Sequence, residues 1–222
     1  MAEAPWPAHL AAAVGPARRS AVLILFGDGA SGPDLLLTRR AATMRWHAGQ
    51  VSFPGGAMED GDRGPVDAAL REAQEETGLD PVGVEAIGLL PELFVEPSRN
   101  LVTPVLAWWP VPSPVGVADP AEVSRVDRLP VRDLVDPAHR FRVRFPDGRS
   151  GPAFRAQGLF VWGFTGILLD RVLECAGWAL PWDRDRWEPL PPGNVDERVN
   201  VVDGGPGSGA GTGLRTGAEG AS

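Results

Sequence analysis

Short apolar runs separated by turn residues recur along the chain and predict a protein rich in strands. Residues 20–27 form a continuous apolar run bounded by turn residues, which is typical of a buried strand. Residues 35–38 follow a turn rich in Gly and Asp, and we expect them to pair with that run as a hairpin. Further strands are expected in residues 50–56, 84–93 and 101–111. Pro104 cannot donate to a central ladder, so we expect an edge or a bulge at that position.

Two segments have the pattern of longer helices. Residues 64–79 carry a proline in the first turn and Gly78 as the stop signal. Four apolar residues share one face of this helix and are expected to pack on the sheet: Val66, Ala69, Leu70 and Ala73. A second helix is expected at residues 165–178, and a short one around 131–135, with a hairpin between them at 141–164. Strands mixed with helices in this way indicate the α/β class.

Composition divides the 222 residues into three parts, of which one is a domain. Residues 1–19 are rich in Ala and Pro and are expected to form an arm. Residues 20–190 contain all the predicted elements and form the expected domain. Residues 191–222 are dominated by Gly, Ser, Ala and Thr, and we expect a disordered tail because they cannot bury enough apolar surface.

The charge balance and residue usage exclude several classes of function. A formal net charge of −8 argues against nucleic-acid binding, although local arginines or a metal ion could still attract a small anion. Every basic side chain other than His is Arg, so no lysine Schiff base can form. The single cysteine, Cys175, is expected in the core and fits a reducing cytoplasm. No segment approaches the ~20 continuous apolar residues of a membrane span, so none is expected.

Three acids stand together on the helix expected at residues 64–79. Glu72, Glu75 and Glu76 are spaced i, i+3 and i+4, which places them on one face. Their mutual repulsion needs compensation, and Arg71 can supply part of it to Glu75. The face is either a solvated acidic surface or a platform for Mg²⁺ or Mn²⁺, which prefer carboxylate oxygens. The helix alone leaves both interpretations open.

The residues around this helix resemble the signature of the Nudix hydrolases. Gly56, Asp62 and the run "REAQEETGL" follow that pattern, although Asp62 replaces the usual glutamate and the spacer is one residue longer. Both departures occur in the coenzyme A (CoA) pyrophosphatase branch. Directly upstream, "LLTRRAATMRWHAGQVSFPGG" at residues 36–56 matches a second signature of that branch, "LLT.R[SA]...R...G...FPGG", at every fixed position. The resemblance covers about residues 20–182.

The resemblance implies a fold and an activity. The expected fold is the Nudix α/β/α sandwich, with a mixed sheet between helices. The expected reaction is metal-dependent hydrolysis of the diphosphate of CoA or an acyl-CoA, giving 4′-phosphopantetheine and adenosine 3′,5′-bisphosphate, with Mg²⁺ or Mn²⁺ as cofactor. A pyrophosphatase for ADP-ribose or another nucleoside-diphosphate derivative, and a non-catalytic ligand sensor, are the alternatives. The preferred thioester, the number of metals and the formation of a homodimer stay open.

The resemblance also implies roles for individual residues. The expected metal ligands are Glu72, Glu75 and Glu76. The expected catalytic residues are Glu75, Glu76 and Arg71, with Arg71 orienting a glutamate. The expected substrate-binding residues are Arg40, Arg45, Gly55 and Gly56. The two arginines would hold phosphates, or alternatively pair with acids of the glycine loop. Asp62 is either the box acid or a helix cap.

Several other residues have two interpretations. Glu122 is a candidate general base or a solvated loop acid. His47 and Thr38 are assigned to the scaffold rather than to the catalytic set. Three tryptophans could stack on adenine but are expected in the core: Trp108, Trp109 and Trp162.

Overall fold

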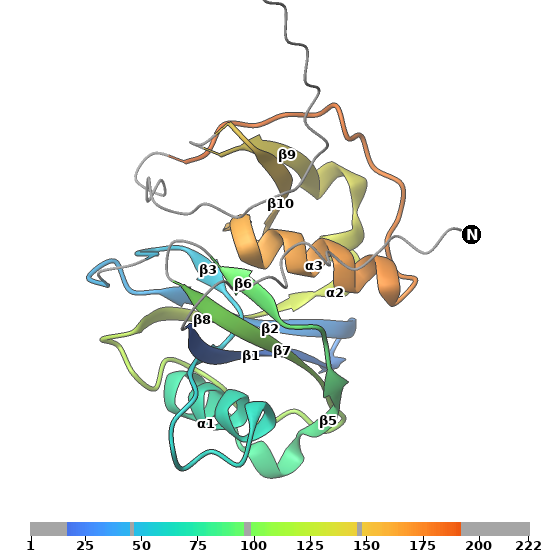
Figure 1. Ribbon diagram of the computed structural model, residues 1–222. Coiled ribbons are helices and arrows are strands. Elements are labelled where there is room, and N and C mark those ends of the chain that lie inside the picture. Colours follow the sequence, from blue (N-terminus) through green and yellow to red (C-terminus); the bar gives the residue numbers. More distant parts are fainter. Residues whose placement is uncertain (1–16, 45–46, 96–98, 146–147, 192–222) are drawn as a thin grey trace, which may run out of the picture.

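The computed structural model describes residues 17–44, 47–95, 99–145 and 148–191. A mixed sheet forms the centre of the molecule, with α1 on one face and α2 and α3 on the other (Figure 1). This arrangement confirms the expected α/β/α sandwich. The predicted arm at 1–19 and tail at 191–222 lie outside the described residues, apart from residues 17–19 and 191.

Eight strands make up the main sheet: β1 (Arg18–Gly29), β2 (Gly32–Arg40), β3 (Val51–Ser52), β4 (Gly55–Ala57), β5 (Glu85–Leu89), β6 (Leu93–Val95), β7 (Asn100–Trp109) and β8 (Val123–Pro130). A second sheet contains β9 (Arg140–Arg144), β10 (Ser150–Ala156) and β11 (Leu159–Val161). The helices are α1 (Pro65–Thr77), α2 (Val131–Val135) and α3 (Gly163–Cys175), with short 3₁₀ turns at Pro81–Gly83 and Pro137–His139.

The strand order of the main sheet is β3–β2–β1–β7–β5. β4 also pairs with β1, β6 with β7, and β8 with β2. β1 and β7 run parallel, whereas the other pairs are antiparallel, so the sheet is mixed. The predicted hairpin is confirmed, because β1 pairs with β2 from Phe26 opposite Leu35 to Gly29 opposite Gly32.

Pro104 lies in an interior strand, so the first of the two expectations, an edge or a bulge, is wrong. The ladder beside it is irregular, because the register between β5 and β7 shifts between Ala86 and Gly88. β7 has β1 on one side, where Pro104 is opposite Val22, and β5 and β6 on the other. The Pro104 carbonyl accepts a 2.9 Å hydrogen bond from the N–H of Leu90, in the segment that joins β5 to β6. Both backbone groups of a strand residue point to the same side, so the missing N–H faces this junction, where the ladder is already interrupted.

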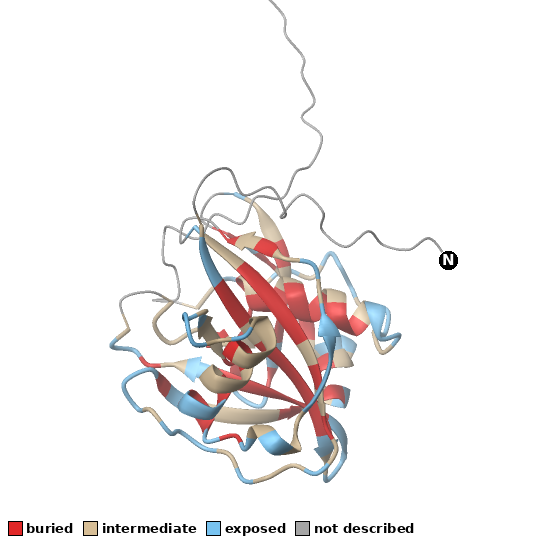
Figure 2. Ribbon diagram, turned by 60° about the horizontal axis from the view of Figure 1, so that its bottom comes forward, coloured by how far each residue is buried: buried red, intermediate tan, exposed pale blue. Residues whose placement is uncertain are grey.

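Alternating residues of the central strands build a core on each face of the sheet. On one face, Leu23, Leu25 and Leu36 pack with three alanines of α1: Ala68, Ala69 and Ala73. On the other face, Ile24, Leu35 and Leu37 pack with residues of α3, including Leu168, Leu169, Val172 and Leu173. The period of two along each strand therefore supplies both layers of the sandwich. Figure 2 shows the buried residues concentrated in the central strands and on the inner sides of the helices.

In the second half of the chain, one expectation is wrong and one buried contact was not predicted. Cys175 is exposed, so its assignment to the core is wrong: it is the last residue of α3, beyond the buried positions that end at Leu173. Asp170 is buried in α3 and pairs with buried Arg140 of β9, which joins the second sheet to the helix.

The longest helices of the described residues, α1 and α3, have 13 residues each. Neither is long enough to span a membrane.

Candidate active site

The acidic face of α1 is not uniformly solvated. α1 begins after Gly64, has Pro65 in its first turn, and ends at Gly78, whose φ of 69° gives the left-handed end typical of glycine. Glu76 is only 2% exposed, whereas the Glu75 side chain is 58% exposed. Burial of a carboxylate is costly without compensation, which argues against an ordinary acidic surface.

Two of the three carboxylates lie against the glycine turn. The N–H of Gly55 donates a 3.2 Å hydrogen bond to Oε2 of Glu76. A Cβ at Gly56 would lie 2.4 Å from the carboxyl carbon of Glu72, so this carboxylate rests directly on the glycine. A Cβ at Gly55, whose φ is 152°, would lie 2.3 Å from the carbonyl oxygen of Ala21 in β1. Both glycines are therefore required by close approach.

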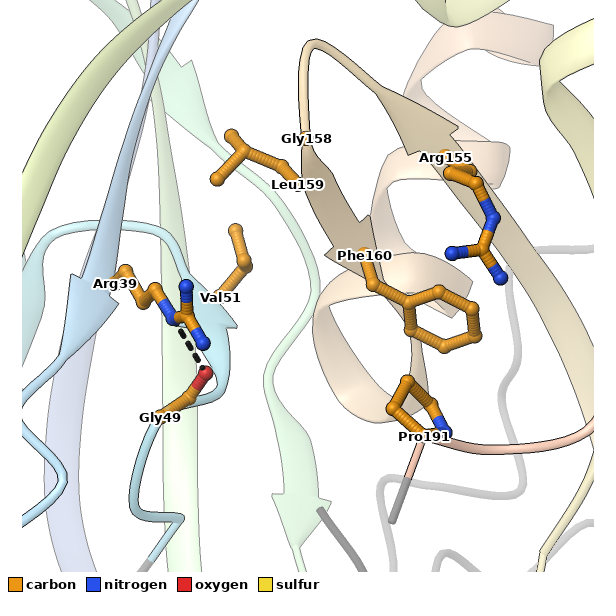
Figure 3. Close-up of a pocket in the computed structure, with 8 residues that line it drawn as sticks. All are labelled: Arg39, Gly49, Val51, Arg155, Gly158, Leu159, Phe160 and Pro191. Carbon is orange, nitrogen blue, oxygen red and sulfur yellow. Dashed lines mark hydrogen bonds between the residues drawn. The ribbon is translucent and has the colours of Figure 1, made fainter. Parts of the chain in front are cut away.

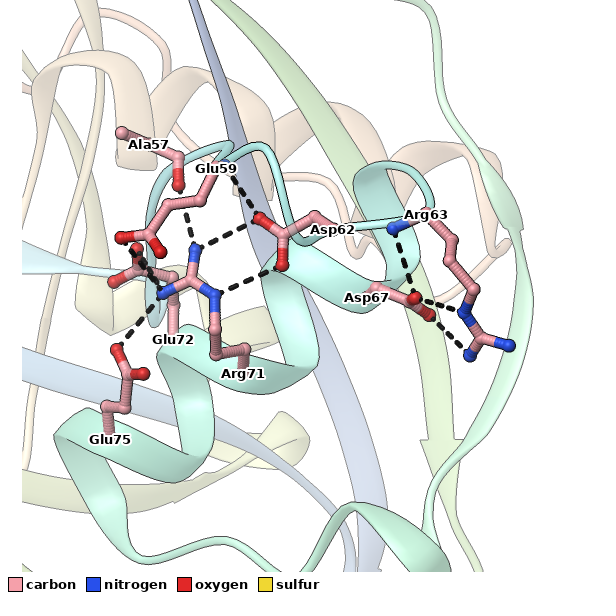
Figure 4. Close-up of polar contacts among 8 residues, drawn as sticks. All are labelled: Ala57, Glu59, Asp62, Arg63, Asp67, Arg71, Glu72 and Glu75. Carbon is pink, nitrogen blue, oxygen red and sulfur yellow. Dashed lines mark hydrogen bonds and ion pairs between the residues drawn. The ribbon is translucent and has the colours of Figure 1, made fainter.

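Arg71 ties the loop before α1 to two of its glutamates (Figure 4). Its Nε and one terminal nitrogen donate to the two carboxylate oxygens of Asp62, each at 3.1 Å. The same terminal nitrogen also donates to the carbonyl of Ala57 at 2.9 Å. The other terminal nitrogen donates to Glu72 and Glu75, each at 3.1 Å. A guanidinium has five N–H donors, and these five contacts use all of them.

Asp62 is held by Arg71 and does not cap the helix, so the interpretation as a helix cap is wrong. The residue before α1 is Gly64, and no side chain caps this end. Besides the contacts from Arg71, one Asp62 oxygen accepts a 2.8 Å hydrogen bond from the N–H of Glu59. The hydrogen bonds from Arg71 are the main reason that the pKa of Asp62 is lowered.

The pKa values of buried Glu76 and half-buried Glu72 are perturbed. Burial raises the pKa of Glu72, and raises that of Glu76 to about 7. The Arg40 guanidinium and the Gly55 N–H act in the opposite direction on Glu76, because both stabilise its ionised form. The nearby charge of Glu122 raises the pKa of both glutamates. Arg40 and Glu122, expected from the sequence as a phosphate ligand and a candidate base, are therefore close enough to influence these carboxylates.

Arg40 keeps donor capacity for a ligand. Its Nε is buried and has no hydrogen-bond partner within the described ranges. It also forms no ion pair with any described residue, so the alternative of pairing with acids of the glycine loop finds no support there. Arg45, the other predicted phosphate ligand, lies outside the described residues.

Scaffold residues behave as the sequence predicted. Thr38 is buried in β2, and its hydroxyl lies 3.1 Å from that of Ser52. Nδ1 of His47 lies 3.1 Å from the amide oxygen of Gln50, within the loop that follows β2. Trp109 and Trp162 are buried, and Trp108 packs against the core on the α3 side of the sheet: these tryptophans belong to the core.

The oxygen donors at the glycine turn suit a hard divalent cation. Mg²⁺ binds through one or two carboxylates and keeps waters for a phosphate-bearing substrate, and Glu72 and Glu76 flank the Gly55–Gly56 turn as such a pair. Glu75 is turned toward Arg71. Among the described residues, no group of three His, Cys, Asp or Glu side chains is preformed for a metal ion. The fit thus depends on Glu72 and Glu76, and a ligand role for Glu75 stays a prediction.

Sequence reasoning missed a pocket on the other side of β2. It has a volume of about 210 Å³ and is lined by Arg39, Gly49, Val51, Arg155, Gly158, Leu159, Phe160 and Pro191 (Figure 3). The doubled arginine at 39–40 signals only the Arg39 wall of this pocket, because successive residues of a strand point to opposite faces. Arg155 and Phe160 carried no such signal, since only folding brings the second sheet to β2.

Comparison with known proteins identifies the family. The model of the NUDIX domain family matches residues 16–147, which are 132 of the 222 residues. The chain therefore belongs to the Nudix domain family.

Individual relatives agree with this assignment. The "Uncharacterized Nudix hydrolase NudL" of Cronobacter sakazakii is 40% identical over 148 residues, and that of Escherichia coli strain K12 is 40% identical over 149. Each alignment covers 64% of this chain and 75% of the relative. A crystal structure of the M. smegmatis Nudix hydrolase RenU matches with a TM-score of 0.51 at 17% identity, covering 75% of this chain and 90% of that chain. These comparisons support a Nudix hydrolase, and the structural match supports the fold.

Proposed function

We propose that the protein hydrolyses the diphosphate of CoA or its thioesters. The observation that carries the proposal is the meeting of two sequence signatures at one point of the fold. Arg40 comes from the upstream signature and acts electrostatically on Glu76, which comes from the helix signature and is bound to Gly55 of the turn between them. A cationic donor beside buried carboxylates suits a phosphorylated anion together with a divalent cation.

The reaction is a simple displacement at phosphorus. Water adds to one phosphorus of the diphosphate, the bond from that phosphorus to the bridging oxygen breaks, and one proton is released. The products are 4′-phosphopantetheine and adenosine 3′,5′-bisphosphate. The protein residues would position the reacting groups and neutralise the phosphate charge, and none would form a covalent bond to the substrate, as expected for transfer of a charged phosphoryl group.

We assign the following roles in this reaction. Glu72 and Glu76 would hold Mg²⁺ or Mn²⁺, which when bound would neutralise phosphate charge and lower the pKa of a coordinated water. Arg40 would bind a phosphate oxygen through its unpaired Nε. Arg71 acts as a positioning residue, because its five donors are already used within the protein. Glu122 is the candidate general base.

The glycine turn would present its backbone to the substrate and the cation. Gly55 and Gly56 leave no room for a side chain between β1 and the carboxylates, so the turn approaches both. Arg45 is retained as a second phosphate ligand from the sequence signature. Residues 20–190 would form the catalytic domain, acting in the cytoplasm.

A panel of four substrates tests the proposal. CoA, acetyl-CoA, dephospho-CoA and ADP-ribose would be incubated with purified protein and Mg²⁺ or Mn²⁺, and the products separated by chromatography. We expect release of adenosine 3′,5′-bisphosphate from CoA and acetyl-CoA, and much slower turnover of the other two. Equal turnover of CoA and ADP-ribose would contradict the proposed specificity. Binding of CoA without turnover of any substrate would favour a ligand sensor.

A further inference from the structure

The pocket between β2 and the second sheet lies apart from the carboxylates of α1. Leu36 packs on the α1 side of the main sheet and Leu37 on the α3 side. Arg39 follows Leu37 by two residues and so shares its side of the strand, whereas Arg40 acts on Glu76 of α1. The end of β2 therefore presents Arg39 toward the pocket and Arg40 toward the carboxylates.

Arginines from three strands gather around this pocket. Arg39 in β2 is directly opposite Arg125 in β8, an unfavourable pairing of like charges on neighbouring strands. Arg125 also reaches the rim, where it donates to the carbonyl of Gln157 at 3.4 Å, next to the lining residue Gly158. Arg155 projects from β10 and lies on the opposite wall from Arg39 (Figure 3).

The acids near the pocket do not balance these charges. Arg125 pairs with Asp127 at 2.6 Å, and Arg155 pairs with Glu188 at 2.8 Å. Glu188 is shared, because it also accepts from Arg186 at 2.6 Å. Arg39 donates its Nε to the carbonyl of Gly49 at 3.1 Å and forms no ion pair with any described residue. Its two terminal nitrogens therefore remain available for an anion.

Apolar groups line the rest of the pocket. Val51 and Leu159 lie between the two charged walls, and the Arg155 guanidinium stacks over the ring of Phe160 at 4.8 Å from its centroid. Guanidinium groups bind phosphate oxygens well, and an aromatic ring suits a flat base. The combination fits a ligand with an anionic phosphate and a planar, weakly polar body.

We propose that this pocket binds the phosphate monoester of an adenine nucleotide, which in CoA is the 3′-phosphate. The proposal rests on the proposed function for the identity of the substrate. The diphosphate would lie at Arg40 and the glycine turn, and the ribose would pass round the end of β2, so that its 3′-phosphate reaches Arg39 and Arg155. Contacts outside α1 would then distinguish CoA from nucleotides that lack the 3′-phosphate.

A binding experiment tests the pocket without requiring catalysis. Adenosine 3′,5′-bisphosphate and adenosine 5′-monophosphate would be titrated into the full chain by calorimetry. The wild type should bind the bisphosphate about tenfold more tightly, because a charge-assisted contact contributes roughly one decade in affinity. Arg39→Gln should remove this preference, whereas Arg184→Gln, an exposed arginine paired with Glu174 outside the pocket, should retain it. Equal affinities in the wild type, or an unchanged preference in Arg39→Gln, would overturn the proposal.

Two variants of the Arg155–Glu188 ion pair distinguish a role in binding an anion from a purely structural role. Arg155→Gln and Glu188→Gln both break the same pair. If the pocket binds an anion, the first should weaken binding of the bisphosphate and the second should strengthen it. Weakening by both variants would indicate a merely structural pair and would contradict the proposed site.

Steady-state kinetics with CoA and dephospho-CoA test whether the pocket contacts the 3′-phosphate of the substrate. In Arg39→Gln, KM for CoA should rise about tenfold, while kcat and the KM for dephospho-CoA stay at the wild-type values. An equal rise in KM for both substrates would contradict recognition of the 3′-phosphate. If the wild type hydrolyses neither compound, the proposed function fails, but the calorimetric comparison still decides whether the pocket recognises the phosphate monoester.

Discussion

The guanidinium of Arg71 and the carboxylate of Asp62 face each other through two hydrogen bonds of 3.1 Å each. This paired contact fixes the loop before α1 against the helix, and the remaining donors of Arg71 hold Glu72 and Glu75. The sequence alone presents the arginine and the acids as neighbours on a helix. Because its five donors are engaged within the protein, we propose that Arg71 arranges the carboxylates rather than contacting a substrate.

Arg71→Lys tests this positioning role. Lys keeps the charge but cannot form the fork to Asp62 while also holding two glutamates. Misplacement of reacting groups by about 1 Å can cost about a hundredfold, so we expect a loss of that order in kcat with an unchanged circular dichroism spectrum. Steady-state hydrolysis of CoA is the measurement. Arg63→Gln, at an 89% exposed arginine paired with Asp67, is the matched control and should retain activity.

Asp62→Asn tests the same contact from its other side. Asn keeps the shape of Asp62 but offers only one acceptor oxygen and no charge, so the fork from Arg71 is lost. We expect a fall in kcat no larger than that of Arg71→Lys, and little further loss in the double variant, because Arg71→Lys already breaks the contact that Asp62→Asn removes. Fully additive losses in the double variant would contradict this coupling.

The two glycines of the turn should respond differently to alanine. Gly56→Ala would push a methyl group into the Glu72 carboxylate, which can move, so we expect weaker Mg²⁺ activation with the fold retained. Gly55→Ala would collide with the β1 backbone at a φ of 152°, so we expect the free energy of unfolding to fall by more than about 2 kcal/mol. Chemical denaturation measures the second effect.

A glycine without close neighbours, Gly88, provides the control for these substitutions. A Cβ at Gly88 in β5 meets no atom within 4 Å, so Gly88→Ala should change the free energy of unfolding by less than about 0.5 kcal/mol. A loss at Gly88 as large as that at Gly55 would contradict the argument from close approach.

The buried pair of Arg140 and Asp170 should contribute to stability rather than to catalysis. Removing one partner leaves an uncompensated buried charge, so Asp170→Ala should cost about 3–5 kcal/mol in the free energy of unfolding. Replacing both residues by apolar ones of similar size should recover much of this loss. Chemical denaturation of the single and double variants measures the effect, and kcat per folded molecule should stay unchanged. A double variant as unstable as the single one would contradict this explanation.

Local patterns predicted much of the fold because strands and helices depend on short-range periodicity. The apolar run of β1, its hairpin partner and the packing of Ala69 and Ala73 of α1 on the sheet were predicted in this way, whereas buried Ala68 was not. Pro104 and Cys175 were misplaced because strand order and the end of a buried helix face are set by tertiary packing.

The site was predictable only as far as the signatures extend. Glu72, Glu76 and the glycine turn lie within one short segment, and the structure brings them together. The contacts of Asp62 could not be predicted, because a capping role and a contact with Arg71 need the same residue at the same position. The Arg155 wall of the second pocket could not be predicted, because it comes from a different sheet from Arg39 and only folding brings the two together.

The central claim is tested most directly by the rate at which adenosine 3′,5′-bisphosphate is released from CoA in Mg²⁺. Wild type and Glu85→Gln, a change at an exposed acid of β5, should release it at the same rate, and a chelator should abolish release in both. Glu76→Gln should lose nearly all activity, because it replaces a buried carboxylate of the turn with a neutral amide of the same shape. Wild-type rates in Glu76→Gln, or release that continues in the chelator, would contradict the proposed metal-dependent site.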